Sequence, residues 1–388
     1  MKIIFGAVVL FFLPILSSYG QENTKVSPDL SDITIKNFPV IDGSDSTQPL
    51  RLILTSKLLG FDYEWQKSIF GGQKPEEHAY EVAPKYTGDK DEIRDLRVNR
   101  LLDSNTHGSF VNLINNKVEL IITARSISRD EKVYADEKGV TLIEKPIAKD
   151  ALAFMVNIKN PIENLSIEQI QGIYTGDIVN WSEVGGLNYE IHPYVRNRNS
   201  GSQEKFETMV MVGLTIMDLP EMRVGSAMMA PYFQLDRDSL GLAFTPFYYF
   251  TYISGTVSSK VIGVNGVPMT KENIKNGTYP YLSNVYAAVR SDIDKSSLAY
   301  RIFEFLTTDG GQDIVEESGY VPLRDTSTGI EINEMKNDRV KSEKYDNAIY
   351  DLQGRKVIGA EANSSLFTLH SSLKKGLYIV NGKKVAVK

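Results

Sequence analysis

Short apolar runs of strand type alternate with amphipathic stretches of helical period between residues 37 and 323. The strand-type runs are 118–124, 151–158, 190–195 and 284–290. Apolar residues recur at helical spacing in four other stretches, which start at Leu50, Phe110, Phe206 and Leu298. This alternation predicts an α/β fold in which mostly parallel strands are covered by helices.

The first twenty residues have the pattern of a secretory signal peptide. Lys2 precedes an apolar run over residues 3–16, and the small residues Ser18 and Gly20 precede Gln21. A permanent membrane helix needs about 20 apolar residues, so the run is short for a span. We therefore predict a cleaved signal peptide over 1–20 and an exported protein that is periplasmic, surface-located or secreted, with an uncleaved anchor as the alternative. Residues 21–37 are polar and are predicted to be a leader to the fold.

The composition changes again after Leu323. Residues 324–345 lack a sustained apolar period and are predicted to be a linker. Residues 346–388 hold short strand-type runs between glycines and polar turns, and they carry seven basic and three acidic side chains. We predict a small β-rich C-terminal module, appended to the main fold.

Composition excludes several classes of function. The 388 residues include 43 Lys and Arg against 49 Asp and Glu, and this net charge of -6 argues against nucleic acid as a partner. The absence of cysteine excludes disulfides, thiol nucleophiles and cysteine-ligated metals. The four histidines show no metal-ligand spacing, and there is no P-loop and no G-x-S-x-G motif. We therefore predict no metal, no cofactor and no enzymatic activity.

Three polar segments stand where helices are expected to begin, namely 46–49, 106–109 and 200–203. The third has the Ser-x-x-Gln spacing of a capping box, and Gly201 allows a ligand to approach the main chain. A helix start carries partial positive charge and unpaired N–H groups, so three converging starts would bind an anion. Arg196 can hold two oxygens of a tetrahedral oxyanion. Taken singly, each segment also fits an ordinary helix cap, and Arg196 also fits a surface ion pair.

Residues 196–202, Arg-Asn-Arg-Asn-Ser-Gly-Ser, resemble the R-x-x-x-S-G-[TS] segment of the phosphate-binding proteins of phosphate ABC transporters. The stretches 160–181, 307–312 and 319–323 are similar to the same family in the same order, so the resemblance covers about residues 38–323. It implies a type II periplasmic-binding-protein fold of two α/β lobes joined by two hinge crossovers. Lobe 1 would comprise 38–150 completed by 288–323, and lobe 2 would comprise 151–287.

The resemblance also implies a function and a set of ligand-binding residues. The protein would capture inorganic phosphate, or a related tetrahedral oxyanion, in the cleft between the lobes and deliver it to an inner-membrane ABC permease. The positions that match the family's contacts are Thr47 and Gln48 in the first loop, Thr106 with His107 beside it in the second, and Arg196, Ser200, Gly201 and Ser202 in lobe 2.

One position departs from the best-known members of that family, which carry an aspartate where this chain has Ala124. In those proteins the aspartate accepts the proton of hydrogen phosphate and repels sulfate, so the preference among phosphate, sulfate and arsenate stays open here. Arg125 resembles an arginine of many relatives, and it either binds the anion or stabilises the cleft without contacting ligand. Neutral His107 is a candidate for the missing acceptor, with a solvated histidine as the alternative.

The C-terminal tail also has a resemblance. Residues 349–357, 373–380 and 383–388 are similar to C-terminal sorting domains of the type IX secretion system of Bacteroidetes. This similarity implies that secretion machinery reads the tail, while a simple accessory β module is the alternative. It also supports a second functional hypothesis, an envelope or surface phosphate sensor or scavenger that has no permease.

Overall fold

The computed structural model describes residues 27–68, 79–324, 349–351, 356–358, 376–380 and 383–387. The chain divides into two compact units, Met1–Leu323 and Arg324–Lys388. The predicted signal peptide and residues 325–345 of the predicted linker lie outside the described residues. Within the described ranges, no helix has both the length and the apolar character that a membrane span needs.

A nine-stranded sheet organises the first unit, and its strands follow the order β1-β4-β12-β5-β10-β7. Strand β11 pairs with β5 and β6, and β13 pairs with β5. The strands are β1 (Ile41–Gly43), β4 (Leu120–Thr123), β5 (Leu142–Asn157), β6 (Asn164–Leu165), β7 (His192–Pro193), β10 (Gly241–Pro246), β11 (Ser259–Val264), β12 (Leu282–Arg290) and β13 (Val321–Pro322). Two further pairs stand apart from this sheet, β2 (Tyr63–Lys67) with β3 (Tyr80–Pro84) and β8 (Val195–Arg196) with β9 (Val224–Gly225).

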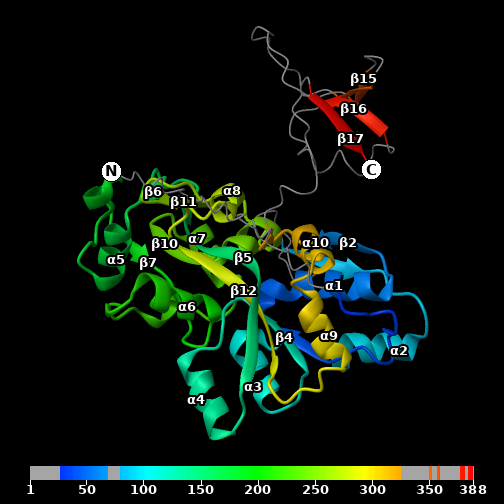
Figure 1. Ribbon diagram of the computed structural model, residues 1–388. Helices are drawn as coiled ribbons and strands as arrows, with labels where there is room; N and C mark the ends of the chain where they lie inside the picture. Colours follow the sequence, from blue (N-terminus) through cyan, green and yellow to red (C-terminus); the bar gives the residue numbers. More distant parts are fainter. Residues whose placement is uncertain are drawn as a thin grey trace, which may run out of the picture. The chain divides into compact units, whose positions relative to one another are not determined.

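The sheet is mixed, so the expectation of mostly parallel strands is wrong for its centre. Strands β1 and β4 are parallel, as are β7 and β10. The long strand β5 runs antiparallel to β12, β10, β11 and β13. Strands β5 and β12 lie side by side through the middle of this unit (Figure 1). The α/β class and the helical covering of the sheet are confirmed.

Strand β5 changes partners along its sixteen residues. Its first part, to Ala151, pairs with β12, and the part from Leu152 onward pairs with β10 and β11. The register with β12 shifts near Pro146, which has no N–H to donate and is tolerated at such a bulge. The strand therefore links two groups of strands. The lobe boundaries at 150/151 and 287/288 stay a prediction.

Side-chain caps begin several helices of the first unit, although α1, α3 and α7 have none. Ser128 and Ser166 each form a capping box at the start of their helices. The bounds are α1 (Gln48–Leu59), α2 (Lys90–Asp95), η3 (Leu96–Arg100), α3 (Asn105–Ile114), α4 (Arg129–Glu137), α5 (Ile167–Thr175), η4 (Trp181–Val184), α6 (Gly201–Lys205), η5 (Phe206–Val210), η6 (Glu221–Arg223), α7 (Ala230–Arg237), η7 (Tyr249–Ile253), α8 (Lys271–Lys275), α9 (Leu298–Phe305) and α10 (Asp309–Glu317). A short 3-10 turn, η1 (Asp45–Thr47), precedes α1.

Two large apolar clusters form most of the core. The first joins α1, α9 and the middle of β12, and it also includes Tyr232 and Tyr248. The second surrounds the end of β5, where Phe154 contacts Phe206 and Phe244. The rings of Phe206 and Phe244 stack with their centroids 4.3 Å apart. This aromatic cluster lies under η5, the continuation of the helix that begins at Gly201.

The second unit contains a four-stranded antiparallel sheet of order β15-β14-β16-β17. Its strands are β14 (Ile349–Asp351), β15 (Lys356–Ile358), β16 (Gly376–Val380) and β17 (Lys383–Val387). Strand-type runs predicted in this stretch of the sequence therefore do form strands. Residues 359–375 of the predicted module lie outside the described residues.

Phe154 provides a test of this core. Replacing it with Ala removes a fully buried ring from the aromatic cluster, so we expect a loss of about 3–5 kcal/mol in the free energy of unfolding. Urea denaturation of the full chain measures this loss. Ile158→Ala is the matched control, because Ile158 follows the same strand with 56% of its surface exposed. Equal stability of the two variants would contradict this description of the core.

Candidate functional site

A cavity of about 330 Å³ opens in the first unit where four chain segments meet, and the single residues Ala124 and Pro246 also line it. Three of these segments are the predicted helix starts, and they come together as the sequence predicts. The residues that line the cavity are Ser44, Asp45, Ser46, Asp103, Asn105, Thr106, Ala124, Arg196, Asn197, Asn199, Ser200, Gly201, Ser202, Ser226, Ala227, Met228 and Pro246.

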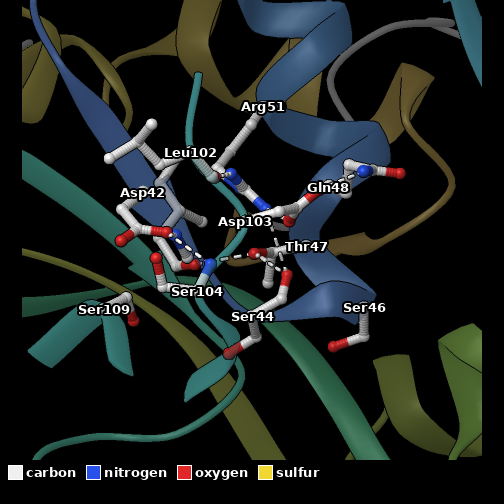
Figure 2. A network of polar contacts seen from close by, with 12 residues as sticks. Asp42, Ser44, Ser46, Thr47, Gln48, Arg51, Leu102, Asp103, Ser104 and Ser109 are labelled. Atoms are coloured by element: carbon white, nitrogen blue, oxygen red, sulfur yellow. Dashed lines mark hydrogen bonds and ion pairs between the residues drawn. The ribbon is translucent and has the colours of Figure 1, made fainter. Parts of the chain in front are cut away.

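Asp42 anchors the first two segments to each other. Its carboxylate, fully buried in the middle of β1, accepts hydrogen bonds from the Ser104 N–H and from Asn112 Nδ2, each at 2.9 Å. Figure 2 shows Asp42 and Ser104 side by side in this network. The start of α3 is therefore held against β1 by a buried carboxylate.

Arg51, on α1, also contacts both of these segments (Figure 2). It is 2% exposed, and it donates to the carbonyls of Ser44 and Leu102 and to the carboxylate of Asp103. Because these contacts lie within the protein, the loops are positioned without any contribution from a ligand.

A small hydroxyl network forms one wall of the cavity. Ser44 Oγ accepts a hydrogen bond from the Ala124 N–H at 2.9 Å and lies 2.7 Å from Thr106 Oγ1. Asn105 adopts a left-handed φ of 57° at the start of α3, a conformation that asparagine tolerates better than most residues. Ala124 contributes only its methyl group and main chain at this place.

The third segment begins α6, which continues directly into η5. Ser200 Oγ accepts from the Ser202 N–H at 3.3 Å. The predicted capping box is wrong, because Gln203 Oε1 accepts from the N–H of Arg196 at 2.9 Å instead of returning to Ser200. A Cβ on Gly201 would lie 2.6 Å from Thr106 Oγ1, so only glycine allows these two helix starts to approach this closely.

Arg196 is the principal charge of the cavity. It is 6% exposed, and within the described residues no carboxylate lies at ion-pair distance from it. Its Nε donates to the Gly225 carbonyl at 3.0 Å and its Nη1 to Met228 Sδ at 3.1 Å. Burial lowers the pKa of Arg196, and the charge of Asp45 partly opposes that shift. A guanidinium has five N–H donors, so donors remain for a group in the cavity.

Asp45 brings a carboxyl group into the same cavity. Burial raises the pKa of Asp45 above its ordinary value, and the charge of Asp103 raises it further, while Arg51 and Arg196 oppose the shift. Asp45 lines the cavity and is exposed to solvent there, while the protein atoms around the cavity partly desolvate its carboxyl group. An acidic group therefore lies within electrostatic range of Arg196. Asp45 is not among the ligand-binding residues predicted from the sequence.

The fourth segment, Ser226–Met228, was missed by the sequence analysis. It follows β9 and precedes α7, whose second residue is Pro231. A serine and small residues shortly before such a proline are typical of a helix start, and this signal was available in the sequence.

Four predicted site residues do not line the cavity. The Thr47 hydroxyl lies 2.8 Å from the Ser44 carbonyl and 2.6 Å from the Ile122 carbonyl, so it is engaged by the main chain. Gln48 donates to Asp103. Arg125 and His107 are both engaged by the carboxylate of Glu131, the former through two contacts of 2.8 Å and the latter at 3.1 Å.

Metal-ligating side chains are not gathered at this site. No group of three or more His, Cys, Asp or Glu side chains is placed to hold a metal within the ranges that the structure describes. The cavity instead offers N–H and hydroxyl donors around one guanidinium, which is the chemistry of anion binding.

The sequence matches a family profile described as a PBP superfamily domain over residues 85–306, more than half of the chain. The chain belongs to the PBP superfamily. Protein SphX of Synechococcus elongatus is 27% identical over 231 residues, which cover 57% of this chain and 67% of that protein. The phosphate-binding protein PstS of Borreliella burgdorferi is 25% identical over 216 residues, which cover 55% of this chain and 75% of that protein.

Solved structures of phosphate-transport proteins share this fold. An ABC-type phosphate transport receptor from Vibrio cholerae aligns with a TM-score of 0.51 at 21% identity, over 73% of this chain and 99% of that one. A protein from Clostridium perfringens, solved with bound phosphate and described as a phosphate ABC transporter substrate-binding protein, aligns with a TM-score of 0.52 at 20% identity, over 74% and 99% of the two chains.

Glu131 provides a test of the contacts beside the cavity. Burial raises its pKa, but the hydrogen bonds and charge of Arg125, with the Ser128 N–H and His107, outweigh burial and hold the pKa below its ordinary value. The stability that ionised Glu131 contributes is therefore present above the ordinary pKa of a glutamate and is lost as the pH falls through the lowered pKa. Glu131→Gln should remove about 3–5 kcal/mol of stability at neutral pH, because Arg125 keeps a buried charge without its partner.

Denaturant titrations from neutral to acidic pH measure this effect. Glu131→Gln should also lose part of the acid dependence of stability that the unmodified protein shows. Glu137→Gln, an exposed change at the end of the same helix, is the control and should leave both properties unaltered. An undiminished acid dependence in Glu131→Gln would contradict the assignment.

Proposed function

We propose that the protein binds inorganic phosphate in the cavity around Arg196 and releases it chemically unchanged. The observation that carries this proposal is the buried guanidinium of Arg196, which faces the cavity with no carboxylate at ion-pair distance among the described residues. A buried charge without a partner is strongly unfavourable, so a site of this kind is suited to a ligand of opposite charge.

The surrounding donors suit a tetrahedral oxyanion. The remaining N–H groups of Arg196 can hold one or two oxygens. The helix starts at Asp45, Asn105 and Gly201 line the cavity, and we propose that their unpaired main-chain N–H groups bind the other oxygens. Side-chain hydroxyls of Ser44, Thr106, Ser200 and Ser202 supply further contacts. We propose Thr106, Arg196, Ser200, Gly201 and Ser202 as ligand contacts, joined by Ser44, Asp45 and Ser46.

The relatives support phosphate as the anion, since PstS proteins are named for binding it and matched structures belong to phosphate transport. We further propose that the protein is exported and delivers phosphate to an ABC permease. The alternative is a sensor or scavenger at the envelope or cell surface, with the C-terminal β unit read by secretion machinery. Hydrolysis is disfavoured because, among the residues that the structure describes, no histidine lines the cavity to activate a serine there.

Asp45 is the residue that we propose to distinguish phosphate from sulfate. A carboxylate within range of Arg196 repels an anion without a proton, but it accepts a hydrogen bond from one that carries a proton. Asp45 would thus supply the acceptor that Ala124 does not. His107 is less suited to this role because its ring is engaged by Glu131 and lies outside the cavity.

Arg196→Ala tests the proposed function directly. Removing the charge should weaken phosphate binding by about 2–5 kcal/mol, because the charge-assisted contacts of a buried guanidinium are lost. Isothermal titration calorimetry of the full chain measures this change. Arg198→Ala is the matched control, since Arg198 is only two residues away and its side chain is 86% exposed. Unaltered phosphate affinity in Arg196→Ala would remove the proposed site.

Asp45→Asn tests the selectivity. Near neutral pH, phosphate still carries a proton and sulfate carries none, so the unmodified protein should prefer phosphate. The variant should lose at least about tenfold of that preference, mainly through a gain in sulfate binding, because the repulsion by a carboxylate is gone. Competition calorimetry with both anions measures the ratio, with Asp130→Asn on exposed α4 as the control. If the ratio of phosphate to sulfate affinity is unchanged in Asp45→Asn, a group other than Asp45 determines the selectivity.

A further inference from the structure

We infer that Met228 is an oxidisable positioning residue for Arg196, and that peroxide converts its thioether to a sulfoxide that disables the anion cavity. This inference rests on the proposed function, since it concerns regulation of the same site. Its basis is one contact at the cavity wall, in which Arg196 Nη1 donates to Met228 Sδ at 3.1 Å. Met228 also lines the cavity and is partly exposed.

The two contacts of Arg196 fix its guanidinium in different ways. The Gly225 carbonyl holds Nε through the main chain, whereas Met228 holds Nη1 through a side chain that reaches the cavity. Arg196 and Gly225 pair in the β8–β9 ladder, and Met228 follows three residues later. The direction of the guanidinium plane therefore depends on the sulfur atom.

A thioether suits this position because it is a weak, uncharged acceptor that does not ionise. A carboxylate there would form an ion pair with Arg196 and compete with the incoming anion. With methionine, the positive charge stays available to the cavity while the orientation of the guanidinium is still controlled.

Oxidation of the thioether would replace this weak acceptor with a strong one. One molecule of hydrogen peroxide transfers an oxygen atom to the sulfur, so that the O–O bond breaks, an S–O bond forms and water is released. The sulfur loses two electrons and the peroxide gains them. The product is a polar sulfoxide whose oxygen is a strong acceptor. Placed beside Nη1, it would bind Arg196 more tightly than the thioether does and would occupy space needed by the anion.

The chain offers matched methionines for comparison. Met222 is 80% exposed and lines a different cavity, so it should oxidise readily with no effect on Arg196. Met155 and Met211 are buried and should oxidise slowly. Met228 should react at a rate between these groups, because it is reached only through the cavity.

The experiment treats the full-length protein, Met228→Leu and Met222→Leu with hydrogen peroxide. Peptide mass spectrometry follows oxidation at each methionine, and ¹⁵N NMR follows the Arg196 side chain, assigned with Arg196→Lys. Calorimetry measures phosphate affinity before and after treatment. We expect oxidation of Met228 to shift the Arg196 signal and to weaken phosphate binding at least about tenfold. Methionine sulfoxide reductase should restore both properties.

The controls separate this inference from general damage. Met222→Leu should respond to peroxide as the unmodified protein does, whereas the affinity of Met228→Leu should be the same before and after treatment. The inference is overturned if Met228 stays reduced while Met222 is oxidised. It is equally overturned if Met228 is oxidised with no shift of the Arg196 signal, or with no change in affinity in a protein that binds phosphate.

Failure of the proposed function has a different signature. If the untreated protein binds no phosphate, that proposal falls. The Arg196 signal then decides the present inference alone, since a shift on oxidation supports the sulfur contact and its absence refutes it.

Discussion

The unfavourable burial of one guanidinium is the constraint on which this site depends. Arg196 is removed from water by β8, β9 and the segment before α7, and its near neighbours include no carboxylate at ion-pair distance within the described ranges. Such a group destabilises the empty protein and is stabilised when an anion arrives. Part of the binding free energy of any anion therefore comes from relief of this desolvated charge.

The loops around the cavity are fixed in place before an anion binds. Asp42 and Arg51 tie the first two helix starts together through buried contacts, so that few side chains need to become ordered on binding. The same design explains why some polar side chains near the cavity do not enter it. The Thr47 hydroxyl holds the main chain and the Gln48 amide holds the carboxylate of Asp103. Residues 44–46, in the turn that precedes them, line the cavity instead.

Local patterns in the sequence predict those parts of the fold in which residues close together in the sequence determine the secondary structure. Amphipathic spacing identifies α1, α3 and α9, because a helix that packs on a sheet needs one apolar face. It misses the first half of β5, where Lys149 and Asp150 interrupt the apolar run and pairing with β12 and β13 sets the conformation. The direction of the Thr47 hydroxyl depends on Ile122, and the role of Met228 depends on a distant arginine. Neither can be obtained from spacing.

The contact between Ser44 and Thr106 limits how the cavity wall can respond to its contents. Ser44 Oγ already accepts from the Ala124 N–H, and the two hydroxyls share one hydrogen bond in which either is able to donate. Two protons are present and one is used between the partners, so a single proton remains to point outward. When both O–H bonds rotate, donor and acceptor exchange roles, and the O–H group that points outward then belongs to the other residue, without movement of a heavy atom. The wall therefore acts as one relocatable donor, able to match oxygens at two alternative positions.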